Sequence, residues 1–296
     1  MKKNKKLHIY KYQGAGNDFV LLDNRQGTYS DLDFRQIARL CDRRFGVGAD
    51  GLMLLEKHEE YSFCMRFFNA DGLPGSMCGN GGRCISAFAL KLGIVPEDTS
   101  FSFWSSDGEH QASILSRHDD RCMVRLQMRD VHCYASNKGR DVFLLDTGSP
   151  HYVMFRKDCQ NIDVVQEGAK IRFSEDFPLG VNVDFVEREK DVLTVRTYER
   201  GVEDETYSCG TGAVASAMAE ALKMYMLPGT HRVDISTKGG QLQVDFEIAA
   251  APRNTPETNF FALPHQFSLY RNRVFRNVFL EGLATFVFEA DVEPGL

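Results

Sequence analysis

Two cysteines in this chain stand directly before a glycine-rich turn. The sequence Cys-Gly-Asn-Gly-Gly begins at Cys78, and Cys-Gly-Thr-Gly-Ala begins at Cys209. At the N-terminus of a helix, the helix dipole and the unpaired backbone N–H groups favour a thiolate over a thiol. Such a thiolate can act as a base. The same N–H groups, with small residues beside them, can bind a carboxylate.

A pair of such thiols suits the inversion of an α-carbon. This reaction removes a proton from one face of the carbon and delivers another proton to the opposite face. If the two helix starts meet across a cleft, one cysteine can act as thiolate while the other stays protonated. A well-aimed donor to the developing charge contributes roughly 3–4 kcal/mol in comparable oxyanion sites. We therefore predict a cofactor-independent amino-acid racemase or epimerase, with Cys78 and Cys209 as the acid–base pair.

The elements around each cysteine follow the same order. Strand-like runs at 65–69 and 194–199 precede the two glycine turns, and apolar residues at helical spacing follow each turn. Polar turns at 105–109 and 237–241 continue the parallel. We interpret this pattern as an internal repeat that places a cysteine at the start of a helix in each half of the chain.

A third similarity joins the start of the chain to its second half. Residues 17–20, Asn-Asp-Phe-Val, resemble residues 182–186, Asn-Val-Asp-Phe-Val, at a different offset. A helix near residues 34–41 explains this offset as extra material in the first half. Ser30 or Asp31 is the predicted cap of this helix, and Gly46 its predicted end.

Two domains are expected from the length of 296 residues. We predict an N-terminal domain of residues 1–127 plus 284–296 that carries Cys78. Residues 128–283 then form a C-terminal domain that carries Cys209. The segment 250–264 is predicted to be an irregular insertion before final strands near 275–280 and 285–288.

The overall composition excludes several classes of protein. The chain is 43% hydrophobic and 26% charged, and its net charge of −6 offers no broad basic surface for nucleic acid. No apolar run reaches the roughly 20 residues that cross a bilayer, so a membrane partner is also excluded. Polar residues follow the lysines of residues 1–6, where a signal peptide has its apolar core. We expect a cytoplasmic protein.

The cysteine pattern argues against a metal centre. The eight cysteines include no Cys-x-x-Cys pair, so we predict no metal ligands. A chain of this length also needs no disulfide scaffold. We expect most of these thiols to be small buried groups, with Cys78 and Cys209 as the exceptions.

Six motifs in order along nearly the whole chain resemble the diaminopimelate epimerase family. They are GAGNDF from Gly14, GVGAD from Gly46, FNADG from Phe68, MCGNG from Met77, YERG from Tyr198 and SCGTG from Ser208. The resemblance implies an α+β fold of two pseudo-symmetric domains, each an antiparallel β-barrel-like sheet wrapped around a central helix. It also implies interconversion of LL- and meso-diaminopimelate in lysine and peptidoglycan precursor biosynthesis, without a cofactor.

The resemblance assigns roles to particular residues. Cys78 and Cys209 are implied as the acid–base pair. The residues implied to bind the substrate are Asn17, Asn69, Gly79, Asn80, Asn182, Glu199, Arg200, Gly210 and Thr211. The expected partner is a small amino-acid substrate, and a homodimer is left open. Two positions depart from the family pattern: Ser149 stands where an asparagine is usual, and Gly51 where glutamine is frequent.

Other interpretations of these residues remain open at this point. Asn17 and Asn69 could support turns, Glu199 and Arg200 could form a solvated pair, and His151 is interpreted as a hydrogen-bonded structural residue. A proline or hydroxyproline racemase is the nearest alternative function. Its substrate, however, has no second charged centre to match Glu199 and Arg200. A metal-binding protein without enzymatic activity and a pyridoxal-phosphate racemase are more distant alternatives.

Overall fold

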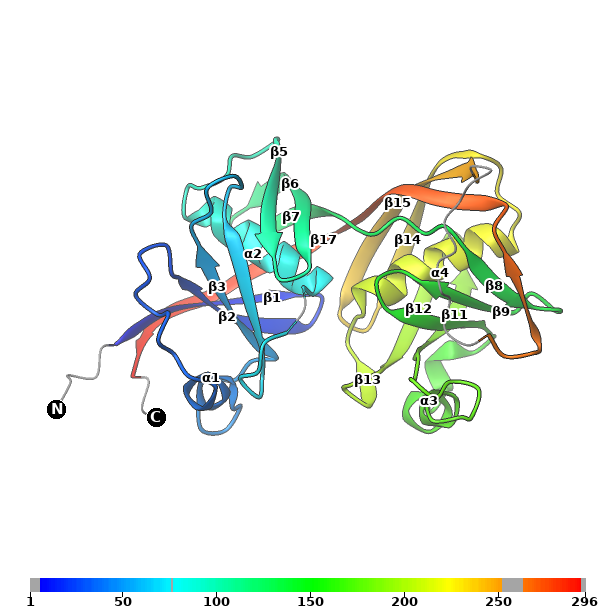
Figure 1. Ribbon diagram of the computed structural model, residues 1–296, viewed down its shortest axis with the longest axis horizontal. Helices are drawn as coiled ribbons and strands as arrows, with labels where there is room; N and C mark the ends of the chain where they lie inside the picture. The colour runs from blue at the N-terminus through cyan, green and yellow to red at the C-terminus, as the bar shows by residue number, and fades with distance from the viewer. Residues whose placement is uncertain (1–5, 76, 252–262, 294–296) are drawn as a thin grey trace. The chain divides into compact units, whose positions relative to one another are not determined.

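The chain forms two compact units in the computed structural model, which describes residues 6–75, 77–251 and 263–293. Unit 1 comprises Met1–Leu126 and Gly282–Leu296, and unit 2 comprises Gln127–Glu281. In each unit one long helix lies among strands, and the last strand of the chain runs from unit 2 into unit 1 (Figure 1).

Unit 1 is a closed ring of strands around a helix. Its elements are β1 (Leu7–Gly14), β2 (Asn17–Asp23), α1 (Phe34–Cys41), β3 (Gly51–Glu56), β4 (Cys64–Asn69), α2 (Gly79–Lys91), β5 (Ser100–Ser105), β6 (Gly108–His118), β7 (Arg121–Gln127) and the end of β17 (Arg273–Val292). Neighbouring strands pair from β1 through β7. β17 then pairs with both β7 and β1 and closes the ring.

The helix α2 lies at the centre of unit 1 because most of its residues are apolar or small. Ile85 and Phe88 are buried, and so are Gly81 and Gly82 of its first turn. The helix contacts β1, β2, β3 and β6. A second apolar cluster under α1 includes Ile9, Ile37 and Leu52. This packing fixes the start of α2, where Cys78 is the N-cap residue.

Unit 2 has a similar ring. Its elements are β8 (Tyr134–Asn137), β9 (Val142–Asp146), β10 (Pro150–Phe155), the short 3-10 helix η1 (Cys159–Asn161), α3 (Val164–Arg172), β11 (Asn182–Glu189), β12 (Val192–Glu199), β13 (Asp204–Thr206), α4 (Gly210–Lys223), β14 (Gly229–Thr237), β15 (Gly240–Ala250), β16 (Phe267–Tyr270) and the start of β17. The helix α4 is buried along nearly its whole length and has Cys209 as its N-cap residue.

The strand pairings follow the same order in the two units. From β1 to β6 they are antiparallel, parallel, antiparallel, parallel and antiparallel. From β9 to β15, with the short β13 aside, the order is identical. The predicted α+β fold with a sheet around a central helix is therefore confirmed. The prediction that each sheet is antiparallel is wrong, because each contains two parallel pairs whose strands are connected through a helix. The strands predicted at 65–69 and 194–199 correspond to β4 and β12.

The predicted explanation for the third similarity is wrong. The helix α1 is not extra material, because α3 occupies the corresponding place between β10 and β11. Asn17 begins β2, whose counterpart in unit 2 is β10, whereas Asn182 begins β11. The two similar segments therefore lie on different strands of the common order, and the shared letters reflect strands that begin beside a polar turn.

The predicted boundaries of α1 and of the last strands also differ from the structure. Asp33 caps α1, because its carboxylate accepts hydrogen bonds from the backbone of Arg35 and Gln36, both at 2.9 Å. The helix ends at Cys41, where the carboxylate of Asp42 binds the next N–H groups. The two predicted final strands form one strand, β17. Most of the predicted insertion at 250–264 lies outside the described residues.

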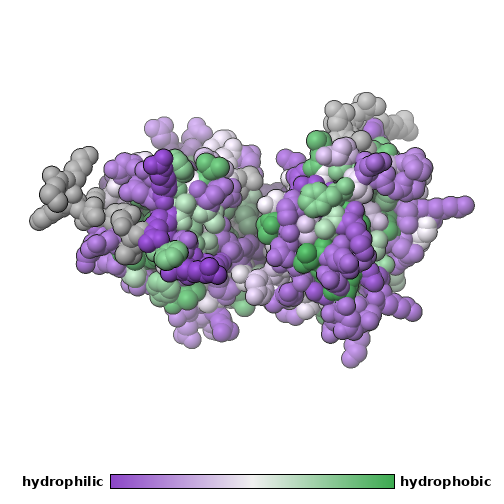
Figure 2. All heavy atoms as spheres, turned by 90° about the horizontal axis from the view of Figure 1, so that it is seen from below, coloured by the Kyte–Doolittle hydropathy of each residue, from purple (hydrophilic) through white to green (hydrophobic). Residues whose placement is uncertain are grey.

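The surface is polar over much of each unit. Hydrophilic residues cover most of the face drawn in Figure 2, with smaller apolar patches between them. Among the described residues, no helix has the length and apolar character to span a membrane.

Candidate active site

Cys78 lies in unit 1 at the point where the chain enters α2. Its backbone is extended, with φ −108° and ψ 133°, and its carbonyl accepts the first helical hydrogen bond, from Gly82 at 2.7 Å. The thiol is half-buried. Gly79 and Asn80 lie in the first turn of the helix, the part of a helix whose backbone N–H groups can bind an anion.

Asn80 connects this helix start to β2. Its side-chain amide donates to Asn17 Oδ1 at 3.0 Å, and its own Oδ1 accepts a hydrogen bond from Arg83 at 2.6 Å. The amide of Asn17 in turn donates to Asp50 at 2.5 Å. The structure therefore brings two predicted site residues, Asn17 and Asn80, into direct contact beside Cys78.

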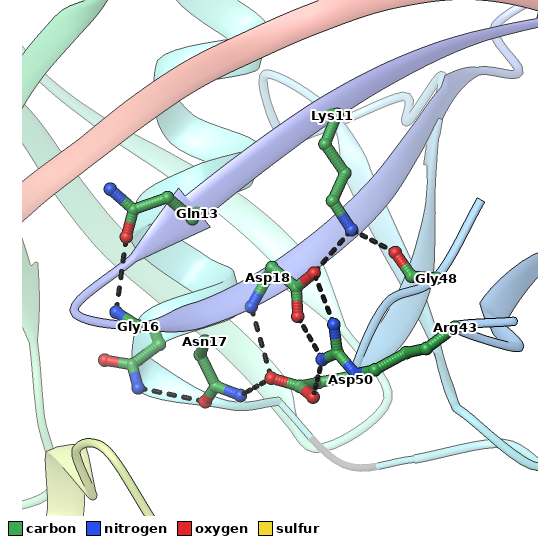
Figure 3. A network of polar contacts seen from close by, with 9 residues as sticks. Lys11, Gln13, Gly16, Asn17, Asp18, Arg43, Gly48 and Asp50 are labelled. Atoms are coloured by element: carbon green, nitrogen blue, oxygen red, sulfur yellow. Dashed lines mark hydrogen bonds and ion pairs between the residues drawn. The ribbon is translucent and has the colours of Figure 1, made fainter. Parts of the chain in front are cut away.

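A cluster of charges holds Asn17 from the other side. Figure 3 shows Lys11, Asp18, Arg43 and Asp50 converging beside it. Arg43 donates to carboxylate oxygens of Asp18 and Asp50, both at 2.6 Å, and Lys11 donates to Asp18 at 2.6 Å. Burial alone would raise the pKa of Asp18. The hydrogen bonds from Arg43 and Lys11 outweigh it and hold this pKa below its usual value. The start of β2 is therefore anchored by ionised groups.

Asn69, the remaining predicted residue of unit 1, lies at the exposed end of β4. Its backbone N–H donates to the carbonyl of Leu73 at 2.9 Å, and its carbonyl accepts from Gly72 at 2.9 Å. Within the described part of the chain, no hydrogen bond links its side chain to Asn17 or Asn80. These contacts place Asn69 in a turn, and its role toward the substrate stays a prediction.

Cys209 occupies the corresponding place in unit 2, but its surroundings differ. Burial raises the pKa of its thiol well above the usual value, and the carboxylates of Glu199 and Asp184 act in the same direction. Hydrogen bonding with Thr211 and with the N–H of Gly212 opposes this rise without overcoming it. The expectation that the helix start favours the thiolate is therefore wrong for Cys209, because the effect of burial on the pKa of this thiol is the largest one.

A buried polar chain leads away from Cys209. Its sulfur lies 3.4 Å from the hydroxyl of Thr211, and this hydroxyl lies 2.9 Å from His151 Nε2. The other ring nitrogen of His151 lies 2.6 Å from Asp184, whose second oxygen accepts from Thr197 at 2.7 Å. His151 and Asp184 are both fully buried. The interpretation of His151 as a hydrogen-bonded residue agrees with these contacts, which also connect it to the site.

Asn182 joins three segments of unit 2. Its amide donates to Ser149 Oγ at 2.8 Å and to the carbonyl of Pro150 at 3.1 Å. Its Oδ1 accepts from the backbone N–H of Arg200 at 2.8 Å. The hydroxyl of Ser149, where the family usually has an asparagine, thus orients Asn182. Glu199 ends β12, and its charge acts on the thiol of Cys209.

Sequence reasoning missed the roles of Asp184 and Arg83. Asp184 appeared only as part of a repeated segment, although an acidic residue between Val183 and Phe185 in a strand signals a buried carboxylate. Arg83 lies in α2, and the residues before and after it in the sequence, Gly82 and Cys84, are buried. A single charge within a buried run is the signal that could have found it.

The third residue of each helix offers a stability test. A Cβ atom at Gly212 would lie 2.4 Å from Asp184 Oδ1, whereas a Cβ atom at Gly81 meets its nearest neighbour, Met53, at 3.4 Å. We expect Gly212→Ala to lower the free energy of unfolding by about 1–3 kcal/mol, because the buried carboxylate must shift. The matched Gly81→Ala variant should change it by less than about 1 kcal/mol.

Urea unfolding of both variants measures this difference. Equal unfolding midpoints for the two variants, with unchanged slopes, would contradict the close packing of Gly212 against Asp184.

No metal centre is apparent in the described residues. No group of three or more His, Cys, Asp or Glu side chains there could hold an ion. All eight cysteines are free thiols.

Comparison with known proteins agrees with this geometry. The model of the family described as diaminopimelate epimerase matches residues 9–131 and 143–255. A diaminopimelate epimerase of Flavobacterium psychrophilum is 41% identical over 97% of this chain and 100% of its own length. A diaminopimelate epimerase of Chlorobaculum tepidum is 44% identical over 69% of this chain and 80% of its own length.

Solved structures show the same fold at low identity. A phenazine biosynthesis protein of the PhzF family from Bacillus anthracis matches with a TM-score of 0.69 and 14% identity, covering 97% of this chain and 99% of its own. A hydroxyproline epimerase from Agrobacterium vitis matches with a TM-score of 0.67 and 14% identity, covering 99% and 94%. The family match and the full-length relatives show that the chain belongs to the diaminopimelate epimerase family.

Proposed function

We propose that this protein is a diaminopimelate epimerase that interconverts LL- and meso-2,6-diaminopimelate, with Cys78 and Cys209 as the two acid–base groups. One observation carries the proposal. In each unit, a cysteine is the N-cap residue of the central helix. Two thiols at equivalent places are what a proton exchange between opposite faces of one carbon needs.

The mechanism follows from the chemistry of these helix starts. The thiolate of one cysteine removes the α-proton, and the thiol of the other delivers its proton to the opposite face. The negative charge that develops spreads onto the α-carboxylate. The N–H groups at Gly79, Asn80, Gly210 and Thr211 are placed in the first turns of α2 and α4, where they can stabilise this charge.

The second centre of the substrate would bind to the remaining residues of unit 2. Diaminopimelate carries a distal ammonium and a distal carboxylate. The carboxylate of Glu199 suits the ammonium, and the guanidinium of Arg200 suits the carboxylate. Asn182 supports this site by holding the backbone of Arg200. Proline has no such distal group, so this pair favours diaminopimelate over the proline and hydroxyproline alternative.

A reducing compartment fits this chemistry, and we propose that the protein works in the cytoplasm. Both catalytic cysteines must be free to exchange protons, and cytosolic thiols stay reduced. The homodimer stays a prediction. The proposed reaction draws on no cofactor.

A direct assay tests the proposed function. The reduced protein is incubated with LL-diaminopimelate, and the isomers are separated by chiral chromatography, with L-proline as the parallel substrate. We expect formation of the meso isomer and no D-proline. Turnover of proline without turnover of diaminopimelate would overturn the proposal in favour of a proline racemase.

A further inference from the structure

Arg83 is a buried cation without a carboxylate partner in the described part of the chain. It is the fifth residue of α2, and its side chain is fully buried. Its guanidinium donates to Asn80 Oδ1 at 2.6 Å and to the carbonyl of Gly79 at 3.3 Å, while Nε has no hydrogen-bond partner. Neutral oxygens do not balance the charge of a buried guanidinium, so an anion is expected beside it.

The nearest groups that could supply this anion are thiols. Burial lowers the pKa of Arg83, and the two side chains whose charges oppose this effect are Cys84 and Cys78. Cys84 is fully buried, and this burial raises its pKa to about 12, so its thiol is neutral near pH 7. Cys78 is half-buried and lies at the start of the helix. The thiolate of Cys78 is therefore the anion that can balance Arg83.

The strands packed on α2 supply no other counter-charge. On β1 and β2, Lys11 pairs with Asp18 at 2.6 Å. Tyr12 of β1 stays neutral, because burial raises its pKa. On β3, Glu56 pairs with Arg66 at 3.0 Å.

The fourth strand, β6, also leaves Arg83 unmatched. His110 of this strand pairs with Asp107 at 3.0 Å, and Glu109 accepts from Tyr61 at 3.4 Å. Arg117 brings a further positive charge, which acts on the thiol of Cys122. The group that can neutralise Arg83 is thus on its own helix.

The same position in unit 2 carries no charge. Val214 stands five residues after Cys209, as Arg83 stands five residues after Cys78, and it is fully buried. The charges that act on Cys209 come from Glu199 and Asp184, and both oppose a thiolate. Arg83 therefore acts on Cys78 with a positive charge, whereas Glu199 and Asp184 act on Cys209 with negative charges.

We propose that Arg83 is the counter-cation of the Cys78 thiolate, so that Cys78 is the thiol that rests deprotonated while Cys209 rests protonated. Arg83 is thus a positioning residue that acts through Cys78. Its hydrogen bond to Asn80, which is itself held by Asn17, fixes the guanidinium behind the first turn of the helix. The role of Cys78 as the base depends on the proposed function. The charge of its thiol in the free protein can be measured without any assumption about that function.

The test is the pH dependence of alkylation at each cysteine. Wild type, Arg83→Met, Arg83→Lys and the control Arg66→Met react with iodoacetamide without substrate at pH values from about 5 to about 10, a range that contains the usual thiol pKa of about 8.5. Mass spectrometry follows each cysteine peptide. In wild type we expect the pH at which alkylation of Cys78 reaches half of its maximal rate, its midpoint, to lie below the midpoint of Cys209. Arg83→Met should raise the Cys78 midpoint by about one pH unit or more and leave Cys209 unchanged.

The conservative variant and the control separate charge from structure. Arg83→Lys should give a Cys78 midpoint close to that of wild type, and Arg66→Met should leave the Cys78 midpoint unchanged. A Cys78 midpoint that stays unchanged in folded Arg83→Met overturns the inference. If Arg83→Met does not fold, the wild-type profile decides, because a Cys78 midpoint at or above that of Cys209 also overturns it. Failure to epimerise diaminopimelate would instead count against the proposed function alone.

Discussion

Replacement of Cys78 or Cys209 by alanine should lower kcat for the epimerisation of LL-diaminopimelate by at least about 10²–10⁴-fold, the usual contribution of a positioned acid or base. In the proposed mechanism, each substitution removes the group that exchanges a proton on one face of the substrate. The fold should persist, because each cysteine begins its helix through an extended N-cap backbone that alanine also adopts. Steady-state rates and thermal unfolding of both variants measure these two outcomes.

Cys64→Ala is the matched control for this prediction. Cys64 is also a free, partly buried thiol, but it lies on β4, at the end away from Asn69. Its substitution should leave kcat within about twofold of wild type, as a change outside the acid–base machinery should. Near-wild-type turnover in Cys78→Ala or in Cys209→Ala would contradict the acid–base assignment.

Arg200→Met should lower kcat/KM for diaminopimelate by about 10²–10³-fold. Removing one partner of a charge-assisted pair costs roughly 2–5 kcal/mol. The backbone of Arg200 is fixed by Asn182. Among the described residues, the hydrogen bonds of its side chain are long ones, to the carbonyls of Leu179 at 3.3 Å and Gly180 at 3.5 Å. Its guanidinium therefore retains donors for a substrate carboxylate.

The control for Arg200 is Arg44→Met, which removes an exposed arginine of unit 1. It should leave kcat/KM unchanged, and Arg200→Lys should recover part of the lost activity, because lysine keeps the charge without the two-pronged geometry. A kcat/KM for Arg200→Met equal to that of wild type would remove Arg200 from the substrate site.

The central helices were predictable because several local signals agree. In both units a strand, a glycine turn and a run of apolar residues at helical spacing point to one arrangement. The thiols of Cys78 and Cys209 fall at the same point of this pattern, and the structure places both at a helix N-cap. Sequence reasoning succeeded where one short segment contained all of the information.

The limits of α1 were predicted less well because several residues compete as caps. Ser30, Asp31 and Asp33 all precede the helix, and each could accept a hydrogen bond from its first turn. Gln36 decides between them, since its side chain reaches back to the N–H of Asp33 and completes a capping box. This reciprocal pair is visible in the sequence once residues three apart are compared.

Long-range polar contacts were beyond the sequence. The chain from Thr211 through His151 to Asp184 joins residues of β10, β11 and α4, which meet only in the folded unit. The same holds for Asn17 and Asn80, which are far apart along the chain. Burial also reversed an expectation, because the helix start alone would favour a thiolate at Cys209, whereas burial raises its pKa.

The surroundings of the two cysteines also suggest why they need not be equivalent. Arg83 of α2 holds a buried guanidinium against the first turn of the helix that Cys78 caps, whereas Asp184 of β11 and Glu199 of β12 are the carboxylates that act on Cys209. One resting thiolate and one resting thiol match the states that a proton exchange requires at its start. The matching strand order of the units therefore coexists with different electrostatics at the two thiols.

Deuterium labelling at early times is the most direct test of the two-thiol exchange. LL-diaminopimelate is incubated with the wild-type protein in heavy water, and the α-carbons of substrate and product are analysed before much conversion. The account predicts deuterium in newly formed meso-diaminopimelate and little in the remaining LL isomer, because the second thiol delivers a solvent-derived deuteron. Equal early labelling of both isomers would indicate a single base and would contradict the account.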